Sequence, residues 1–119
     1  MSNPEQDRRI DYIEFPAVET KNTKHFYSSV FGWKFEDYGP SYAAFHDGRL
    51  AGGFQAGDLG RTSQPLVVIY AVDLEGAERA VTAAGGTITK AIFSFPGGRR
   101  FHFKDPNGNE LAVWSEERA

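Results

Sequence analysis

The sequence contains no cysteine, which excludes disulfide bonds, thiolate metal sites and cysteine nucleophiles. It also lacks an apolar run long enough to cross a bilayer, and its start, MSNPEQDRR, lacks the apolar stretch of a signal peptide. Together these absences predict a cytoplasmic protein with no membrane partner. The formal net charge is −3, so the chain also lacks the strong positive balance of nucleic-acid-binding proteins, and we expect no nucleic-acid partner.

What is present is enough for one packed domain. The chain has 119 residues, of which 40% are hydrophobic and 24% charged, so a core is available and a disordered chain is not expected. Aromatic residues make up 14%, ten of them Phe, and they suit strands and concave sites. We expect residues 1–9 to be a disordered lead-in and residues 10–116 to form a single domain.

The order of elements repeats along the chain. In the first half we expect a strand over 10–15, a helix over 21–31 ended by Gly32, a strand over 32–39 and a hairpin over 41–54 that makes a two-residue turn at Asp47–Gly48. After a turn-rich connector over 57–65, we expect a strand over 66–72, a helix capped by Asp73 with a buried stripe of Ala77, Ala80, Val81 and Ala84, a strand over 87–95 and a hairpin over 99–115.

Both halves therefore have the order strand, helix, strand, strand, strand, which is an internal repeat. The sequence predicts an α+β fold of two βαβββ modules, one over about 10–56 and the other over about 65–116. One such unit has too few strands to cover both faces of its sheet. Two units side by side would bury their helices on one side and leave a shared groove on the other.

The closing hairpin, FHFKDPNGNELAVWSE, has two unlike faces. Asp105, Pro106 and Gly108 mark its turn. Alternation gives one apolar face and one mixed face. The apolar face carries Phe101, Phe103, Leu111 and Val113, and the mixed face carries Arg100, His102, Lys104, Glu110, Ala112 and Trp114. The mixed face suits the wall of a polar cavity.

Two segments carry a family resemblance. IEFPAVETKNTKHFYSSVFGWKF and the ending FKDPNGNELAVW, within the paired βαβββ pattern, resemble the vicinal oxygen chelate superfamily over residues 10–116. That superfamily includes glyoxalase I, bleomycin-resistance proteins, extradiol dioxygenases and fosfomycin-resistance enzymes. The resemblance implies that the two modules form a curved mixed sheet around a cleft, with the helices on the outer face. It also implies a small-molecule ligand and a homodimer.

The resemblance also implies where a metal ion would bind. The four ligand positions of metal-dependent members fall on Tyr12, on Gly52 or Gly53, on Val67 and on Ala112. Apart from a deprotonated tyrosine, none of these residues is a good ligand for a divalent cation, and an open catalytic site needs about three protein ligands. We therefore expect no metal at this place and no cofactor.

Two residues are candidates for proton transfer. His102 lies on the mixed face, and its imidazole suits either a cross-strand hydrogen bond or proton transfer near neutral pH. Glu14 shares a strand face with Tyr12 and has two interpretations. It forms a structural ion pair with Arg100 or Lys104, or it is a ligand-binding acid or general base whose pKa is raised by burial.

Four further residues are candidates for ligand binding. Arg100 would bind a carboxylate or phosphate, although an edge-strand charge pair explains it equally well. Tyr12, Tyr42 and Trp114 would line the cleft with rings that have a polar tip. The other two histidines have simpler interpretations, a solvated helix residue at position 25 and a turn residue at position 46.

Three functions compete on these grounds. The first is a metal-free protein that binds a small, anionic or aromatic metabolite or drug, in the mode of bleomycin-resistance proteins. The second is a glyoxalase-like lyase or isomerase in which Glu14 or His102 moves a proton, with no metal or with one at a non-standard place. The third is an interaction module whose cleft is vestigial.

Overall fold

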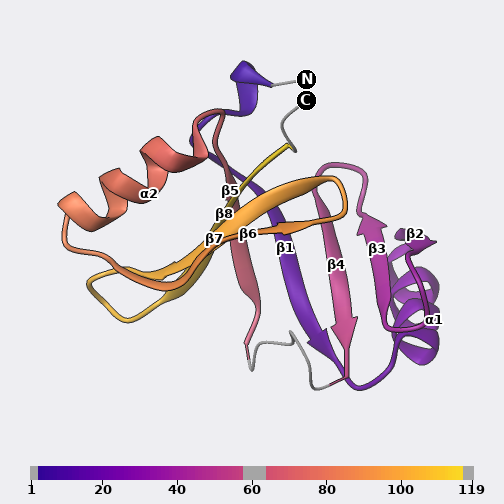
Figure 1. Ribbon diagram of the computed structural model, residues 1–119. Coiled ribbons are helices and arrows are strands. Elements are labelled where there is room, and N and C mark those ends of the chain that lie inside the picture. The colour runs from indigo at the N-terminus through magenta and orange to yellow at the C-terminus, as the bar shows by residue number, and fades with distance from the viewer. Residues whose placement is uncertain (1–2, 58–63, 117–119) are drawn as a thin grey trace. The chain divides into compact units, whose positions relative to one another are not determined.

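The computed structural model describes residues 3–57 and 64–116 (Figure 1). It divides into two compact units, which we call the first module (residues 12–57 and 64–66) and the second module (residues 3–11 and 67–116). Most of the connector expected over 57–65 lies outside the described residues. The elements are a 3-10 helix over Pro4–Gln6, then β1 (Arg9–Ala17), α1 (Thr20–Phe31), β2 (Lys34–Asp37), β3 (Tyr42–His46), β4 (Ala51–Ala56), β5 (Leu66–Tyr70), α2 (Leu74–Ala83), β6 (Thr87–Phe95), β7 (Gly98–Lys104) and β8 (Glu110–Glu116).

The predicted α+β class and the repeated βαβββ order are confirmed. In the first module the strands lie in the order β2-β3-β4-β1, with β1 parallel to β4 and the other neighbours antiparallel. The second module repeats this as β6-β7-β8-β5, with β5 parallel to β8. Each helix packs against strands of its own module (Figure 1). The cleft between the modules stays a prediction.

The first module has an aromatic core on the face that α1 covers. Phe45 and Phe54 are buried there, and the rings packed around them are Phe15, Tyr27, Trp33 and Phe35. The Glu19 carboxylate accepts hydrogen bonds from the Asn22 amide at the start of α1, and Gly32 ends the helix at a φ of 73°. Among the large apolar side chains of α1 only that of Tyr27 packs into the core, whereas Phe26, Val30 and Phe31 are exposed.

The second module has a more aliphatic core, and the buried stripe expected on α2 is confirmed for two of its four residues. Asp73 caps α2 as predicted, because its carboxylate accepts a hydrogen bond from the Gly76 amide at 3.0 Å. Ala80 and Ala84 of the expected stripe are exposed. Ala77 and Val81 pack on the core as expected, and the buried face starts one turn earlier, at Leu74. The core consists of Leu74, Ala77 and Val81 of α2 with Phe101, Phe103, Val113, Ile69, Ala71, Ile88 and Ile92.

Two of the hairpin turns, those after β3 and β7, are set by aspartates. The loop between β3 and β4 has four residues, 47–50, and not the predicted two, because His46 pairs with Ala51. The Asp47 carboxylate accepts hydrogen bonds from the amides of Arg49 and Leu50, which stabilises the longer loop. The turn after β7 is as predicted, with Asp105 Oδ1 accepting from the amides of Asn107 and Asn109.

The described residues before β1 are bonded to the second module. The Asn3 amide donates to the Tyr70 hydroxyl at 2.9 Å, and Asp7 Oδ1 accepts from the Val72 amide at 2.8 Å. The Arg8 amide donates a hydrogen bond to the Tyr70 carbonyl oxygen at 2.7 Å. These bonds place the start of β1 beside β5. No helix in the described ranges, 3–57 and 64–116, is long and apolar enough to cross a membrane.

Candidate functional site

The mixed face of β7 buries one histidine. His102 pairs with Ala112 on β8, points away from the Phe101 side that packs on α2, and is only 1% exposed. Its Nδ1 lies 3.4 Å from Glu110 Oε2. Its Nε2 is buried and has no hydrogen-bond partner among the described residues. A buried polar nitrogen of this kind is costly, and most such atoms in proteins are paired.

The surroundings of His102 keep its imidazole neutral. Burial lowers the pKa of His102 most, and the positive charges of Arg100 and Lys90 lower it further, to about 4. Glu110 acts in the opposite direction through its hydrogen bond and its charge, but the lowering causes prevail. Near pH 7 the ring therefore carries one proton and one nitrogen lone pair, the form that accepts a hydrogen bond.

Aromatic rings and a cation lie on the same face of β6 and β7 as this histidine. The Phe93 ring centroid lies 5.8 Å from that of His102. The Arg100 guanidinium carbon lies 5.6 Å from the Phe93 centroid and 5.8 Å from the Phe95 centroid, within cation–π range. Phe95 is in turn 6.4 Å from Trp114. The second module thus gathers three of the predicted site residues, Arg100, His102 and Trp114, on one face.

The sequence reasoning missed Phe93, Phe95 and Lys90 as members of this group. A signal was present, because a tight turn at residues 96–97 pairs Phe95 with Gly98 and Phe93 with Arg100. Lys90 could not be placed in this way, since the register of β6 shifts between residues 90 and 93. Trp114 has a structural role besides, as its Nε1 donates to Asp11 Oδ2 at 2.9 Å.

The neighbouring arginine faces the other way, as its position on β7 predicts. Arg99 Nη1 donates to Glu75 Oε2 at 2.6 Å, and Nη2 lies 3.3 Å from Glu75 Oε1. This bidentate pair joins β7 to α2, and the hydrogen bond raises the pKa of Arg99. Arg99 is therefore a structural residue, and Arg100 remains the cation on the histidine side.

The first module gathers the other three predicted residues. The hydroxyl oxygens of Tyr12 and Tyr42 lie 2.6 Å apart and share a hydrogen bond. Glu14, 6% exposed, lies opposite Gly53 in the pairing of β1 with β4. Side chains alternate between the two faces along a strand, and Phe15 and Phe45 point into the α1 core. Tyr12, Glu14 and Tyr42 therefore lie on the opposite face. The ion pairs considered between Glu14 and Arg100 or Lys104 join different modules and stay predictions.

The residues at the metal positions of the superfamily do not fit a metal ion. A Cβ atom at Gly53 would lie 2.1 Å from the Tyr42 hydroxyl and 2.6 Å from the Tyr12 hydroxyl, so the phenol pair fills the space of any ligand side chain there. At the corresponding place in the second module, Ala112 is buried beside His102 and offers no donor atom. Across residues 3–57 and 64–116 no group of three or more His, Cys, Asp or Glu side chains could hold a metal.

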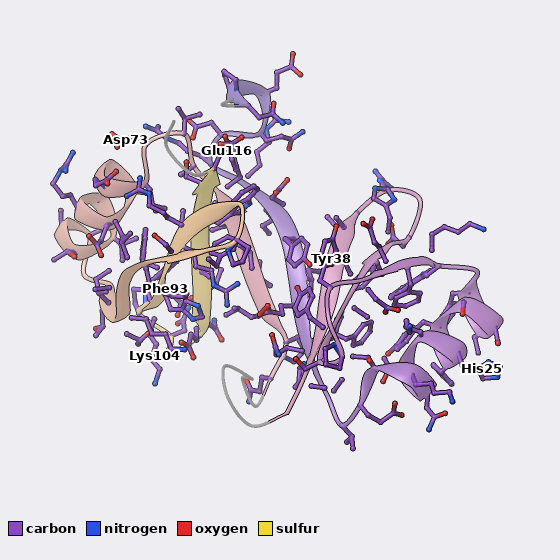
Figure 2. All side chains as sticks on the ribbon, turned by 45° about the vertical axis from the view of Figure 1, so that its right-hand side comes forward. His25, Tyr38, Asp73, Phe93, Lys104 and Glu116 are labelled. Carbon is purple, nitrogen blue, oxygen red and sulfur yellow. The ribbon has the colours of Figure 1, made fainter. Side chains whose placement is uncertain are left out.

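The two remaining histidines lie on the surface of the first module. His25 is exposed and projects from α1 (Figure 2). His46 is exposed at the hairpin, where its Nδ1 accepts a hydrogen bond from the Gly48 amide at 3.0 Å. His102 is thus the buried histidine of the three.

Comparison with known proteins places this architecture in a family. Tandem βαβββ modules with a helix on one face of each define the class of fold. The chain belongs to the glyoxalase/bleomycin resistance protein/dioxygenase superfamily, whose model matches residues 9–113. A search of curated proteins finds no match.

Solved structures agree on the fold. A superfamily member from Vibrio splendidus 12B01 has a TM-score of 0.72 at 15% identity, covering 92% of this chain and 99% of that one. A hypothetical protein from Bacillus halodurans C-125 has a TM-score of 0.76 at 12% identity, covering 94% and 96%. Methylmalonyl-CoA epimerase from Mycobacterium tuberculosis has a TM-score of 0.71 at 11% identity, covering 92% and 88%. At these identities the likeness concerns the fold.

Proposed function

We propose that the chain is a metal-independent protein of this superfamily that binds a small molecule, in the mode of bleomycin-resistance proteins. The observation that carries the proposal is the buried Nε2 of His102, which has no hydrogen-bond partner among the described residues. Leaving such an atom unpaired costs about 1–3 kcal/mol, a cost that a bound ligand would offset. The Phe93 ring lies next to the imidazole, and the Arg100 cation lies over the Phe93 and Phe95 rings, a mixture of groups that ligand sites use.

A thermal-shift screen tests this proposal. The purified protein is heated with compact anions, antibiotics and aromatic metabolites, because a ligand that binds the native state raises the melting temperature. We expect at least one compound to stabilise the parent protein and to lose this effect in a His102→Phe variant. A His25→Gln variant, changed at an exposed position on α1, is the matched control. A screen without a single stabilising compound would contradict the proposal.

A second candidate function is an isomerase or lyase that acts by proton transfer. It is favoured by the neutral state of His102 near pH 7, since a neutral imidazole can accept a proton, and by the burial of the Glu14 carboxylate. If Glu14→Gln and His102→Ala both leave a discovered activity unchanged, this candidate fails. Metal analysis of the purified protein separates a metal-dependent enzyme from the proposed binder.

The proposal includes a homodimer in the cytoplasm, as the family resemblance implies. Pairing of two copies is common in soluble proteins and follows closed symmetry. Sedimentation velocity measures this directly, with a single species of twice the 13.2 kDa chain mass as the expected result. A dimer that binds none of the screened compounds would favour the interaction module over the binder.

A further inference from the structure

The chemistry around His102 narrows the class of ligand, on the condition that the proposed binding function holds. We propose that the ligand is a flat ring carrying an un-ionised hydroxyl group, such as a phenol, whose O–H donates a hydrogen bond to His102 Nε2 while the ring packs against Phe93. The proposal rests on the tautomer of His102, the charges that face it and the ring beside it.

The tautomer of His102 decides whether its Nε2 donates or accepts a hydrogen bond. His102 Nδ1 faces a carboxylate oxygen of Glu110 at 3.4 Å. A carboxylate only accepts, so the proton of the neutral ring belongs on Nδ1. The lone pair is then on Nε2, the buried atom without a partner in the described chain. Such an atom accepts a hydrogen bond from an O–H group and repels an anionic oxygen.

The neighbouring charges favour a hydroxyl over other donors. Two cations face His102, Arg100 on its own strand and Lys90 on β6, while Glu110 on β8 faces Nδ1. An ammonium ligand would be repelled by this pair of positive charges. A hydroxyl oxygen, which becomes more negative as its proton is shared, is stabilised by them. The same cations disfavour protonation of His102 and so keep Nε2 an acceptor near pH 7.

The Phe93 ring beside His102 favours an aromatic ring on the ligand. Phe93 is 37% exposed although its ring lies next to His102. It belongs to the part of β6 where the pairing with β7 changes register. For a ligand to reach Nε2, the Phe93 side chain would have to rotate, on the face of the sheet opposite the Phe101 core. A flat ligand would then stack on the Phe93 ring in place of solvent.

Phenol and anisole form the test pair, because they share the ring and differ in the O–H donor. Their dissociation constants are measured by NMR titration of the full chain at pH 7, together with those of benzoate and benzylamine. The 15N shifts of His102 are followed in the same samples. We expect Nδ1 to carry the proton in the free protein, phenol to shift Nε2, and phenol to bind about tenfold more tightly than anisole.

Two variants report on the role of His102. His102→Phe is expected to remove the tenfold preference for phenol, whereas His102→Gln, which retains an acceptor oxygen, is expected to keep part of it. Circular dichroism checks that both variants fold. Equal binding of phenol and anisole, tighter His102-dependent binding of benzoate, or a phenol-bound state with an unmoved Nε2 shift would overturn the inference. In those cases a hit in the thermal-shift screen would still support the binding function.

Discussion

The two modules share one order of elements but differ in what fills their cores and in what lies on the opposite face. In the first module, Phe45 and Phe54 pack among four further aromatic rings. In the second, Leu74, Ala71 and Val113 surround Phe101. On the face away from the helix, the first module joins two phenols by a hydrogen bond, whereas the second buries a histidine nitrogen that has no partner within the described residues.

This difference shows how a repeated fold can hold unequal sites. Packing on the helix constrains only every second residue of a strand, and both modules meet that constraint with apolar side chains. The alternate residues are free to diverge in chemistry. In the first module they became Tyr12, Glu14 and Gly53, and in the second Arg100, His102 and Ala112. The second module therefore carries the stronger candidate site.

The largest expected effect concerns the two cores. Phe54→Ala should lower the free energy of unfolding by about 3–5 kcal/mol, because it removes a ring that contacts Phe15, Tyr27 and Phe45 at centroid distances of 5.2, 5.1 and 5.4 Å. Leu74→Ala in the second module should cost about 2–5 kcal/mol. Urea denaturation measures both. A smaller loss for Phe54→Ala than for Leu74→Ala would contradict the expectation that the aromatic core contributes more to stability per side chain.

The next effect is a pH dependence that belongs to the second module. The pKa of His102 is about 4 in the folded protein against 6.5 for the free side chain, so the unfolded chain binds more protons between these values. The contribution of the neutral His102 to the free energy of unfolding is therefore fully present above about pH 6.5. It is lost as the pH drops toward 4, by on the order of 3 kcal/mol. Denaturation midpoints measured from pH 7 to pH 4 report it.

His102→Gln should remove this part of the pH dependence, since glutamine does not titrate. His25→Gln, on an exposed position of the first module, controls for the loss of one histidine. An unchanged acid slope in His102→Gln would mean that other groups cause the loss of stability. The two modules would then not differ in this respect.

Most of the fold was predictable from the sequence because local signals and periodicity agreed. Gly32, Asp73 and the Asp105 turn lie at helix ends and strand connections as predicted, and Phe101 alternates with His102 as the strand period requires. The Asp47 loop was longer than predicted because the hydrogen bonds that its carboxylate accepts compete with the two-residue turn.

The site was less predictable, because its chemistry depends on contacts between strands. His102 was singled out by alternation, but its neutral state requires Lys90 and Arg100 beside it, and the position of Lys90 depends on a register shift in β6. In the first module, the sequence marks Tyr12 and Tyr42 as polar aromatic residues. Their hydrogen bond arises only from the pairing of β1 and β3 on either side of β4.

Two glycines of β4 test how the first module makes room for its side chains. A Cβ atom at Gly52 would lie 2.4 Å from the backbone oxygen of Ile13 and 2.3 Å from the Phe45 ring. Gly52→Ala should therefore cost about 1–3 kcal/mol, because the strand itself must shift. Gly53→Ala meets the phenol pair instead, and its cost should shrink in a Tyr42→Ala background. Thermal unfolding of the four variants measures this coupling.

The smallest expected effect concerns the hydrogen bond between the phenols of Tyr12 and Tyr42 in the first module. Tyr12→Phe removes one hydroxyl from the 2.6 Å contact and should lower the free energy of unfolding by about 0.5–1.5 kcal/mol. Tyr38→Phe is the matched control, since Tyr38 is 60% exposed and water can pair with Glu36 when the hydroxyl that bonds it is removed. If the two variants lose equal stability, the phenol pair contributes no more than a surface hydroxyl. A larger loss in Tyr12→Phe would mean that the hydrogen bond between the two half-buried phenols stabilises the first module.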